Sequence, residues 1–261
     1  MDKLRVLDLF SGIGGFSLGL ERTGGFRTVT FCEIEPYCRA VLRKHWPDVP
    51  CFEDVRKLTA SDVGPIDVIC GGFPCQDLSV AGTRVGITGE RSGLWSHYWR
   101  LIGEIRPRFA LVENVPGLLI GERGAWFGRV LGDLAEIGYD AEWHCIPVAA
   151  VGGEHIRDRV WIVAYPGEVA GGDAASIEPR TPKTQSRENE IRRKENQNRD
   201  IPIMGRKAFM GLHRGNPEPD IPRMADGVPY QLDRNGALGN AVYPAIPEII
   251  GRAILEAEGL K

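Results

Sequence analysis

The chain of 261 residues lacks a hydrophobic run of about 20 residues, the length that a helix needs to cross a bilayer. Its first residues, Met1 to Arg5, lack the basic and then apolar layout of a signal peptide. We therefore expect a cytoplasmic protein without a membrane partner. None of the six cysteines forms a Cys-x-x-Cys pair, which argues against structural zinc and predicts no bound metal. Six cysteines without a signal peptide fit free thiols in a reducing cytosol.

A net positive charge is also absent, because the formal net charge is −3. The charges are nevertheless distributed unevenly. Residues 178–214 contain 10 Lys or Arg and 5 Asp or Glu, whereas acidic residues are in excess in the rest of the chain. A basic segment on an acidic body is typical of an element that faces phosphate groups. A solvated insert without a partner has the same composition, so both interpretations stay open at this point.

Short apolar segments alternate with amphipathic stretches along the first two thirds of the chain. The segments with the character of strands are residues 4–9, 28–33, 66–70, 109–113 and 160–164. The stretches with helical spacing are residues 14–22, 36–45, 94–105 and 126–137, with one more at 247–258. This alternation predicts an α/β fold with a doubly wound, mostly parallel sheet.

The composition changes after residue 166. Residues 168–225 are polar and rich in Gly, Pro, Arg and Asn, and such a composition buries little apolar surface unaided. We expect an α/β domain at 1–166 and a small polar region at 167–232 that is partly disordered without a ligand. A C-terminal motif and helix at 233–261 are expected to return to the first domain.

The segment Asp8 to Phe16 follows a strand and opens a helix, the position at which backbone approaches a ligand closely. Gly12 and Gly14 match the first two glycines of a dinucleotide fingerprint whose third glycine is missing. Glu33 ends the next strand, about where an acid binds a ribose hydroxyl pair, and Asp54 could reach an adenine amino group. The set suits an adenosyl cofactor, although a tight turn with solvated acids would have the same pattern.

Cys75 stands at the carboxyl end of an apolar strand that runs into Gly71-Gly72-Phe73-Pro74. Ligands and reacting groups collect at this edge of open α/β sheets. The proline stiffens the approach and the glycines clear space, which favours Cys75 as a nucleophile. Cys70, within the strand, has the setting of an inert core thiol. No histidine lies nearby in the sequence, which argues against a Cys–His hydrolase.

Glu113 also ends an apolar strand, where burial would raise the pKa of its carboxyl and suit it to act as an acid. Arg157 and Arg159 alternate with their neighbours, and this spacing puts both on one face of a strand. Arginine forks suit phosphates and carbonyl oxygens. The structural alternatives are an exposed acid at a strand end and a strand face held by salt bridges.

Taken in order, these segments resemble the DNA cytosine-5 methyltransferase family of bacteria and phages, over about residues 3–165 and 232–255. Asp8 to Phe16 is similar to the family's cofactor loop, Gly72 to Gln76 to its nucleophile motif, and Glu113 to Val115 to its acid motif. His155 to Arg159 is similar to its Gln-x-Arg-x-Arg motif, with His155 in place of Gln, and Gly239 to Val242 is similar to its final motif. The resemblance implies the class I S-adenosylmethionine-dependent methyltransferase fold.

The resemblance also implies an activity, that of a DNA (cytosine-5-)-methyltransferase. A methyl group would pass from S-adenosylmethionine to C5 of a cytosine flipped out of a specific duplex sequence. Cys75 would form a covalent bond with C6 of the base. Glu113 would hold N3 and the exocyclic amine, Arg159 the O2 carbonyl, and Arg157 the loop or a phosphate.

By the same resemblance, cofactor contacts come from both ends of the chain: Phe10, Gly12, Gly14, Gly15, Glu33, Asp54, Pro74, Leu94, Asn240 and Val242. The expected DNA contacts are Gln76, Ser79, Arg84 and Arg91. The glycine-rich stretch 79–92 is expected to close over DNA, which makes it a candidate for the slow step. Residues 167–232 would read the target sequence.

The expected partners are double-stranded DNA and a cognate restriction endonuclease, or DNA alone for a phage-type orphan enzyme, with the chain acting as a monomer. One alternative is methylation of cytosine in tRNA. The tRNA-methylating branch carries a Cys-Phe-Thr motif in its recognition region, whereas this chain has no cysteine after Cys145. A non-catalytic DNA-binding relative is a further alternative, against which the intact Cys75, Glu113 and Arg159 argue.

Overall fold

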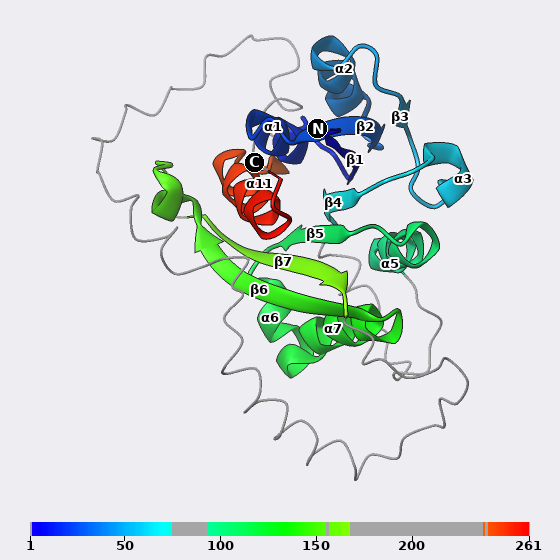
Figure 1. The fold of residues 1–261 in the computed structure, drawn as a ribbon. Helices are drawn as coiled ribbons and strands as arrows, with labels where there is room; N and C mark the ends of the chain where they lie inside the picture. Colours follow the sequence, from blue (N-terminus) through cyan, green and yellow to red (C-terminus); the bar gives the residue numbers. More distant parts are fainter. Residues whose placement is uncertain (1, 75–92, 155–156, 168–236, 238–239, 261) are drawn as a thin grey trace.

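The structure is a computed structural model that describes residues 2–74, 93–154, 157–167, 237 and 240–260 (Figure 1). Within these residues, its centre is a seven-stranded sheet in the order β3-β2-β1-β4-β5-β7-β6. The strands are β1 (Leu4–Leu9), β2 (Phe26–Cys32), β3 (Cys51–Phe52), β4 (Val68–Gly72), β5 (Phe109–Asn114), β6 (Tyr139–Pro147) and β7 (Asp158–Pro166). β7 runs antiparallel to both of its neighbours, and the other pairs are parallel. The predicted doubly wound, mostly parallel sheet is confirmed.

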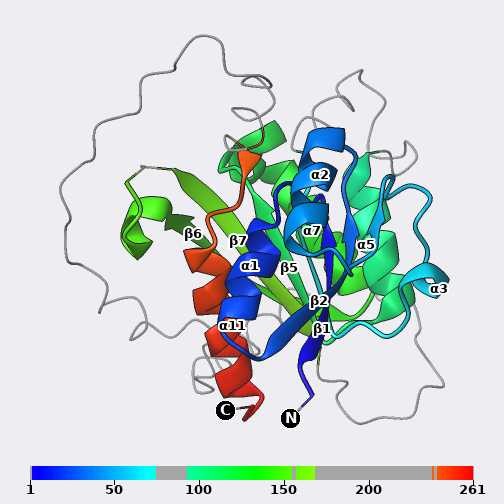
Figure 2. The same cartoon turned by 90° about the horizontal axis from the view of Figure 1, so that it is seen from above.

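Helices cover both faces of the sheet because the strands alternate their buried side chains between two cores (Figures 1 and 2). In β1, Val6 contributes to one core and Leu7 to the other. The first core contains side chains of α1 (Gly15–Arg22) and α11 (Ala245–Ala257). The second contains side chains of α5 (Leu94–Ile105), α6 (Gly117–Ile120) and α7 (Ala125–Glu136). The remaining helical elements are α2 (Pro36–His45), α3 (Ala60–Val63), η1 (Gly121–Gly124) and η2 (Val148–Val151).

The C-terminal segment lies directly against the first helix (Figure 2). A Cβ atom on Gly15 would lie 2.3 Å from the carbonyl oxygen of Val242, and one on Gly19 would lie 2.2 Å from that of Pro244. Side chains at these two positions of α1 would therefore collide with backbone. Ile250 and other isoleucines of α11 fill the core beneath α1. The C-terminal helix and the first helix therefore share one hydrophobic core on the same face of the sheet.

β6 is absent from the sequence prediction, which places no strand between residues 138 and 160. The prediction also gave the last strand as 160–164, whereas β7 extends from Asp158 to Pro166. Within the described chain, no helix combines the length and the apolar character needed to cross a membrane.

Candidate active site

A cavity of about 1170 Å³ lies at the carboxyl ends of β1, β2, β4 and β5. This is the edge at which open α/β sheets bind their ligands. Ten residues that the sequence singles out line it: Phe10, Gly12, Glu33, Asp54, Pro74, Leu94, Glu113, Arg157, Arg159 and Asn240. Residues from positions 10 to 240 therefore meet around one space.

The glycine loop after β1 forms one wall of the cavity. Its backbone is left-handed at Phe10 (φ 52°), Gly12 (φ 54°) and Gly14 (φ 86°), a conformation that favours glycine. The position of a Cβ on Gly12 would have no atom within 4 Å, so the backbone there is open to a ligand. Phe10 adopts this region despite its side chain, and such strained residues cluster at ligand sites.

Glu33, just after β2, is held by two backbone amides. The amide of Gly12 donates to Oε2 at 2.6 Å, and the amide of Glu35 donates to Oε1 at 2.8 Å. A carboxylate offers about four acceptor positions, so two remain after these bonds. Glu33 can therefore accept hydrogen bonds from a pair of hydroxyl groups, such as those of a ribose.

Gly14, Gly15 and Val242 are not among the residues that line the cavity. A Cβ on Gly14 would lie 2.7 Å from the ring of Trp46, and Gly15 and Val242 contact each other. In this structure these residues pack the glycine loop against Trp46 on one side and against the C-terminal segment on the other. Their predicted contact with a cofactor stays a prediction.

At the other end of the cavity, Glu113 forms an ion pair with Arg159. Oε1 of Glu113 lies 2.8 Å from Nε of Arg159, and the two side chains are 13% and 18% exposed. Burial raises the pKa of Glu113, and the positive charges of Arg159 and Arg157 partly offset this effect. Within the described residues the ion pair with Arg159 uses Oε1, and Oε2 of Glu113 lies where a Cβ on Gly72 would be 2.6 Å away. Glycine at position 72 thus leaves room for this second carboxyl oxygen beside an arginine.

Two residues of the site carry roles that the sequence analysis missed. Asn114 is buried, and its Nδ2 donates to the carbonyl oxygen of Phe73 at 2.8 Å, which ties the end of β4 to the end of β5. The sequence feature that could have identified Asn114 is its polar side chain at the end of an apolar strand. His97 also lines the cavity, from α5, and burial lowers the pKa of its imidazole. The sequence feature that could have placed His97 in the cavity is its spacing of three residues from Leu94, which puts both on one face of the helix.

Several predicted site residues lie outside the described part of the chain. They are Cys75, Gln76, Ser79, Arg84, Arg91 and His155. The stretch 79–92 and nearly all of the polar region 167–232 also lie outside it. Pro74, which precedes Cys75 in the sequence, does line the cavity.

Asp8 is a fully buried carboxyl group beneath the glycine loop. Its Oδ2 accepts hydrogen bonds from Oγ of Ser17 at 2.7 Å and from the amide of Ser17 at 3.3 Å, and its Oδ1 has no partner within the described residues. Burial, reinforced by the charge of Glu33 and opposed by the bonds from Ser17, raises the pKa of Asp8 from 3.8 to about 7. The folded protein therefore keeps a proton that the unfolded chain releases near pH 4.

This proton predicts how stability depends on pH. Between about pH 4 and pH 7 the folded state binds more protons at Asp8 than the unfolded state, so this group lowers stability as the pH rises. One proton corresponds to about 1.4 kcal/mol per pH unit. We expect Asp8→Asn to gain thermal stability relative to the wild type across this window, as measured by Tm from pH 4 to pH 8.

Asp62 provides the matched control for this comparison. Hydrogen bonds from Thr59 lower the pKa of this exposed carboxyl from 3.8, so the stability difference between Asp62→Asn and the wild type should change mainly below about pH 4 and stay nearly constant above about pH 5. A difference between Asp8→Asn and the wild type that stays constant over the window would contradict the proposed titration of Asp8.

Comparison with known proteins gives a consistent result. Residues 4–213 match the model of the family described as C-5 cytosine-specific DNA methylase. The chain is 38% identical over 165 residues to the type II methyltransferase M2.BsuMI of Bacillus subtilis (strain 168), which covers 62% of this chain and 42% of the relative. It is 28% identical over 269 residues to the type II methyltransferase M.NgoBI of Neisseria gonorrhoeae, which covers 98% of this chain and 82% of the relative.

Among solved structures, the chain is similar to a protein encoded within an Escherichia coli prophage and assigned as a DNA modification methyltransferase. The TM-score is 0.54 at 27% sequence identity, and the match covers 69% of this chain and 53% of the other. The matched part of this chain spans less than half the length of M2.BsuMI.

Proposed function

Because the chain belongs to the family of C-5 cytosine-specific DNA methylases, we propose that it transfers the methyl group of S-adenosylmethionine to C5 of cytosine in double-stranded DNA. The observation that carries this proposal is the single cavity that joins two chemically different ends. Acidic residues and Phe10 lie at one end, and the Glu113–Arg159 ion pair lies at the other. A donor and an acceptor of the methyl group can therefore meet inside it.

The residues at the first end fit the cofactor. Glu33 has acceptor capacity for the ribose hydroxyls, Asp54 is an acceptor for the adenine amino group, and Phe10 offers an aromatic face beside them. Leu94 and Asn240 would complete the pocket. Bound there, S-adenosylmethionine would supply a methyl group made electrophilic by its positively charged sulfur.

The residues at the second end suit the base. The thiolate of Cys75 would form a bond with C6, and the electrons of the C5–C6 double bond would shift into the ring. Glu113 would donate a proton toward N3 and accept a hydrogen bond from the 4-amino group, which limits the negative charge on the base. Arg159 would donate to the O2 carbonyl. Each of these contacts strengthens as charge develops on the ring.

C5 would then be nucleophilic enough to take the methyl group, with S-adenosylhomocysteine as the leaving group, and the proton on N3 would return to Glu113 when the product base forms. A water molecule would remove the proton from C5, and the electrons of that bond would re-form the C5–C6 double bond while the Sγ–C6 bond breaks. Cys75 is thereby released as a thiolate. The base cannot reach the cavity inside a duplex, so we infer that it is flipped out, at a cost of a few kcal/mol.

On the DNA side, we assign phosphate or base contacts to Gln76, Ser79, Arg84 and Arg91, and sequence recognition to residues 167–232. The excess of positive charge in residues 178–214 suits this role, because phosphate neutralisation drives DNA binding. We propose that the enzyme works as a monomer inside the cell, in a restriction–modification system with a partner nuclease or as a phage-type orphan.

The test is expression in a bacterial host without cytosine methylation, followed by mapping of 5-methylcytosine in its genome at base resolution. The expected result is methylation at one short sequence motif. A genome without the mark, combined with 5-methylcytosine in the cellular RNA, would overturn the proposal in favour of the RNA-methylating alternative.

A further inference from the structure

Asp54, in the loop after β3, has one carboxyl oxygen bonded within its own loop and one without a partner among the described residues. Its Oδ1 accepts two hydrogen bonds from Arg56, at 2.8 Å from Nε and 3.0 Å from the backbone amide. These bonds keep Asp54 ionised, since they lower the pKa of its carboxyl. Within the described residues Oδ2 accepts no hydrogen bond, so one oxygen stays available for a ligand in the cavity. Arg56 belongs to the same loop as Asp54, so its bonds do not fix the position of that loop relative to the rest of the protein.

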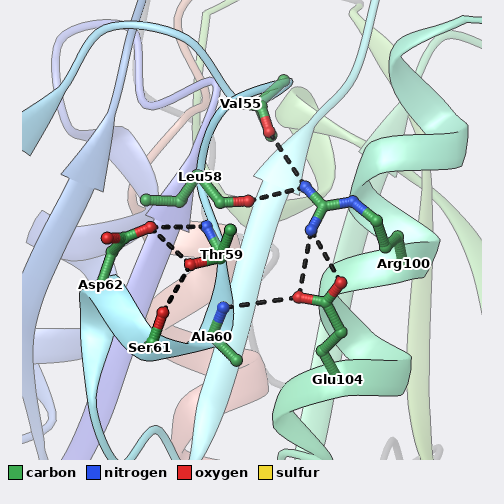
Figure 3. A network of polar contacts seen from close by, with 8 residues as sticks. All are labelled: Val55, Leu58, Thr59, Ala60, Ser61, Asp62, Arg100 and Glu104. Atoms are coloured by element: carbon green, nitrogen blue, oxygen red, sulfur yellow. Dashed lines mark hydrogen bonds and ion pairs between the residues drawn. The ribbon is translucent and has the colours of Figure 1, made fainter.

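Two hydrogen bonds from Arg100 tie this loop to α5. Nη2 of Arg100 donates to the carbonyl oxygen of Leu58 at 2.7 Å and to that of Val55 at 3.3 Å (Figure 3). These residues are 42 and 45 positions away in the sequence. The side chains of Val55 and Leu58 are buried in the core, so the loop is held by its apolar side chains and by its carbonyls. Because Nη2 bonds both carbonyl oxygens, Nη1 remains available for a further acceptor, and a lysine has no second nitrogen with which to divide its bonds in this way.

Glu104 completes the network one turn further along α5. It accepts hydrogen bonds from Nη1 of Arg100 at 2.9 and 3.0 Å, and its Oε2 lies 3.4 Å from the amide of Ala60 at the start of α3 (Figure 3). The capping box formed by Thr59 and Asp62 lies at the beginning of α3. Glu104 therefore pairs with Nη1 of the guanidinium, whereas the carbonyl oxygens of Val55 and Leu58 are bonded by Nη2 of Arg100.

α5 also lines the cavity. Leu94 and His97 line it, and His97 lies three residues before Arg100, on the same face of the helix. The same helix therefore lines the cavity and, through Arg100, bonds to the loop that carries Asp54. Without Arg100, no side-chain hydrogen bond within the described residues would join the loop residues 54–58 to α5.

We propose that Arg100 is a positioning residue for adenine recognition: it holds the Asp54 loop against α5 so that Oδ2 of Asp54 meets the 6-amino group of the cofactor. This inference rests on the proposed use of S-adenosylmethionine. It predicts a specific loss of discrimination at the 6-position of the purine, and not a uniform weakening of cofactor binding.

The test measures the binding of two ligands to the full chain by calorimetry. S-adenosylhomocysteine carries the 6-amino group, and S-inosylhomocysteine carries a 6-oxo group in its place. The wild type should bind the adenosyl ligand about 10- to 100-fold more tightly, since a charge-assisted hydrogen bond is lost and two oxygens face each other in the inosyl complex. In Arg100→Gln this ratio should fall at least about tenfold or approach one, and Arg100→Lys should lie between.

The controls separate positioning from general damage. Asp54→Ala gives the ratio expected when the acceptor is lost altogether. Glu104→Gln keeps the bonds from Arg100 to the two carbonyls and should retain the wild-type ratio within about twofold. Arg252→Gln breaks another Arg–Glu pair of the same spacing, on α11, and should leave the ratio unchanged. Thermal denaturation checks that each variant is folded, and Arg100→Lys provides the ratio if Arg100→Gln does not fold.

The outcomes distinguish the inference from the function on which it rests. Equal weakening of both ligands in the Arg100 variants, or an unchanged ratio, would overturn the positioning role while cofactor use stands. A wild type that binds neither ligand would contradict the proposed function itself.

Discussion

Replacement of Cys75 by alanine is expected to abolish methyl transfer, with a loss of roughly four orders of magnitude or more, while S-adenosylhomocysteine still binds. The reason is that C5 of cytosine becomes nucleophilic only after a thiolate adds to C6. Cys32 and Cys38 also line the cavity, but burial raises the pKa of their thiols to about 12 and about 11, so neither supplies a thiolate at neutral pH. Glu33 and Asp54, the residues proposed to bind the cofactor, line the cavity on other strands and loops, and the substitution leaves them unchanged. Incorporation of labelled methyl groups into DNA measures the first quantity, and calorimetry measures the second.

Cys145 is the matched control for this variant. It is an exposed free cysteine of β6 that does not line the cavity, so Cys145→Ala should keep full activity. A second measurement uses DNA with 5-fluorocytosine, in which C5 carries no proton to remove. The wild type should remain covalently attached to this DNA, and Cys75→Ala should not. Transfer at the wild-type rate by the alanine variant would refute the covalent route.

The placement of Cys75 in this argument combines sequence with neighbouring structure. Its predecessor Pro74 lines the cavity, and the carbonyl of Phe73 is held by Asn114 at the end of the adjacent strand. Because Glu113 directly precedes Asn114, the same strand end carries the proposed acid and holds the backbone that leads to the proposed nucleophile. We therefore expect the two reactive groups to depend on one another for their positions.

Much of the fold could be predicted from the sequence, because local patterns determine it. Residues 4–9 form β1 and residues 36–45 form α2, as the apolar spacing indicates. β6 escaped prediction because it is an edge strand, in which Trp143 and the two following residues are exposed, so its residues lack the apolar pattern of the inner strands. The antiparallel direction of β7 likewise depends on pairing with β5 and β6, which no local pattern encodes.

The candidate site shows the same division between local and distant information. The ends of β1, β2, β4 and β5 meet at one edge of a parallel sheet, so acids and glycines that follow strands could be expected to gather there. The bonds that hold them could not be predicted in this way. Arg100 reaches carbonyls more than 40 positions away, and Gly15 meets Val242 from the far end of the chain. These contacts depend on how helices pack on the sheet, and the residue types alone do not specify them.

Replacement of Glu113 by glutamine is expected to lower kcat/KM by about 10²- to 10⁴-fold, the usual range for loss of a positioned acid. Glutamine keeps the shape and can still donate a hydrogen bond, but it cannot transfer a proton to N3 as C6 is attacked. It also removes the ion pair at 2.8 Å and leaves Arg159 without a negative partner in a partly buried place. Glu142→Gln is the matched control, because this glutamate accepts a hydrogen bond from Tyr165 away from the cavity.

The pH dependence tests the role of Glu113 more specifically than the size of the loss. Burial raises the pKa of Glu113, and the positive charges of Arg159 and Arg157 limit the rise. Only the protonated form can donate to N3. The ratio of wild-type to Glu113→Gln activity should therefore be largest at low pH and should fall as the pH rises through the pKa of Glu113, whatever the titration of Cys75 contributes to both proteins. A ratio that stays constant or increases with pH would mean that Glu113 acts only as an ionised partner of Arg159, and that the proton on N3 comes from another source.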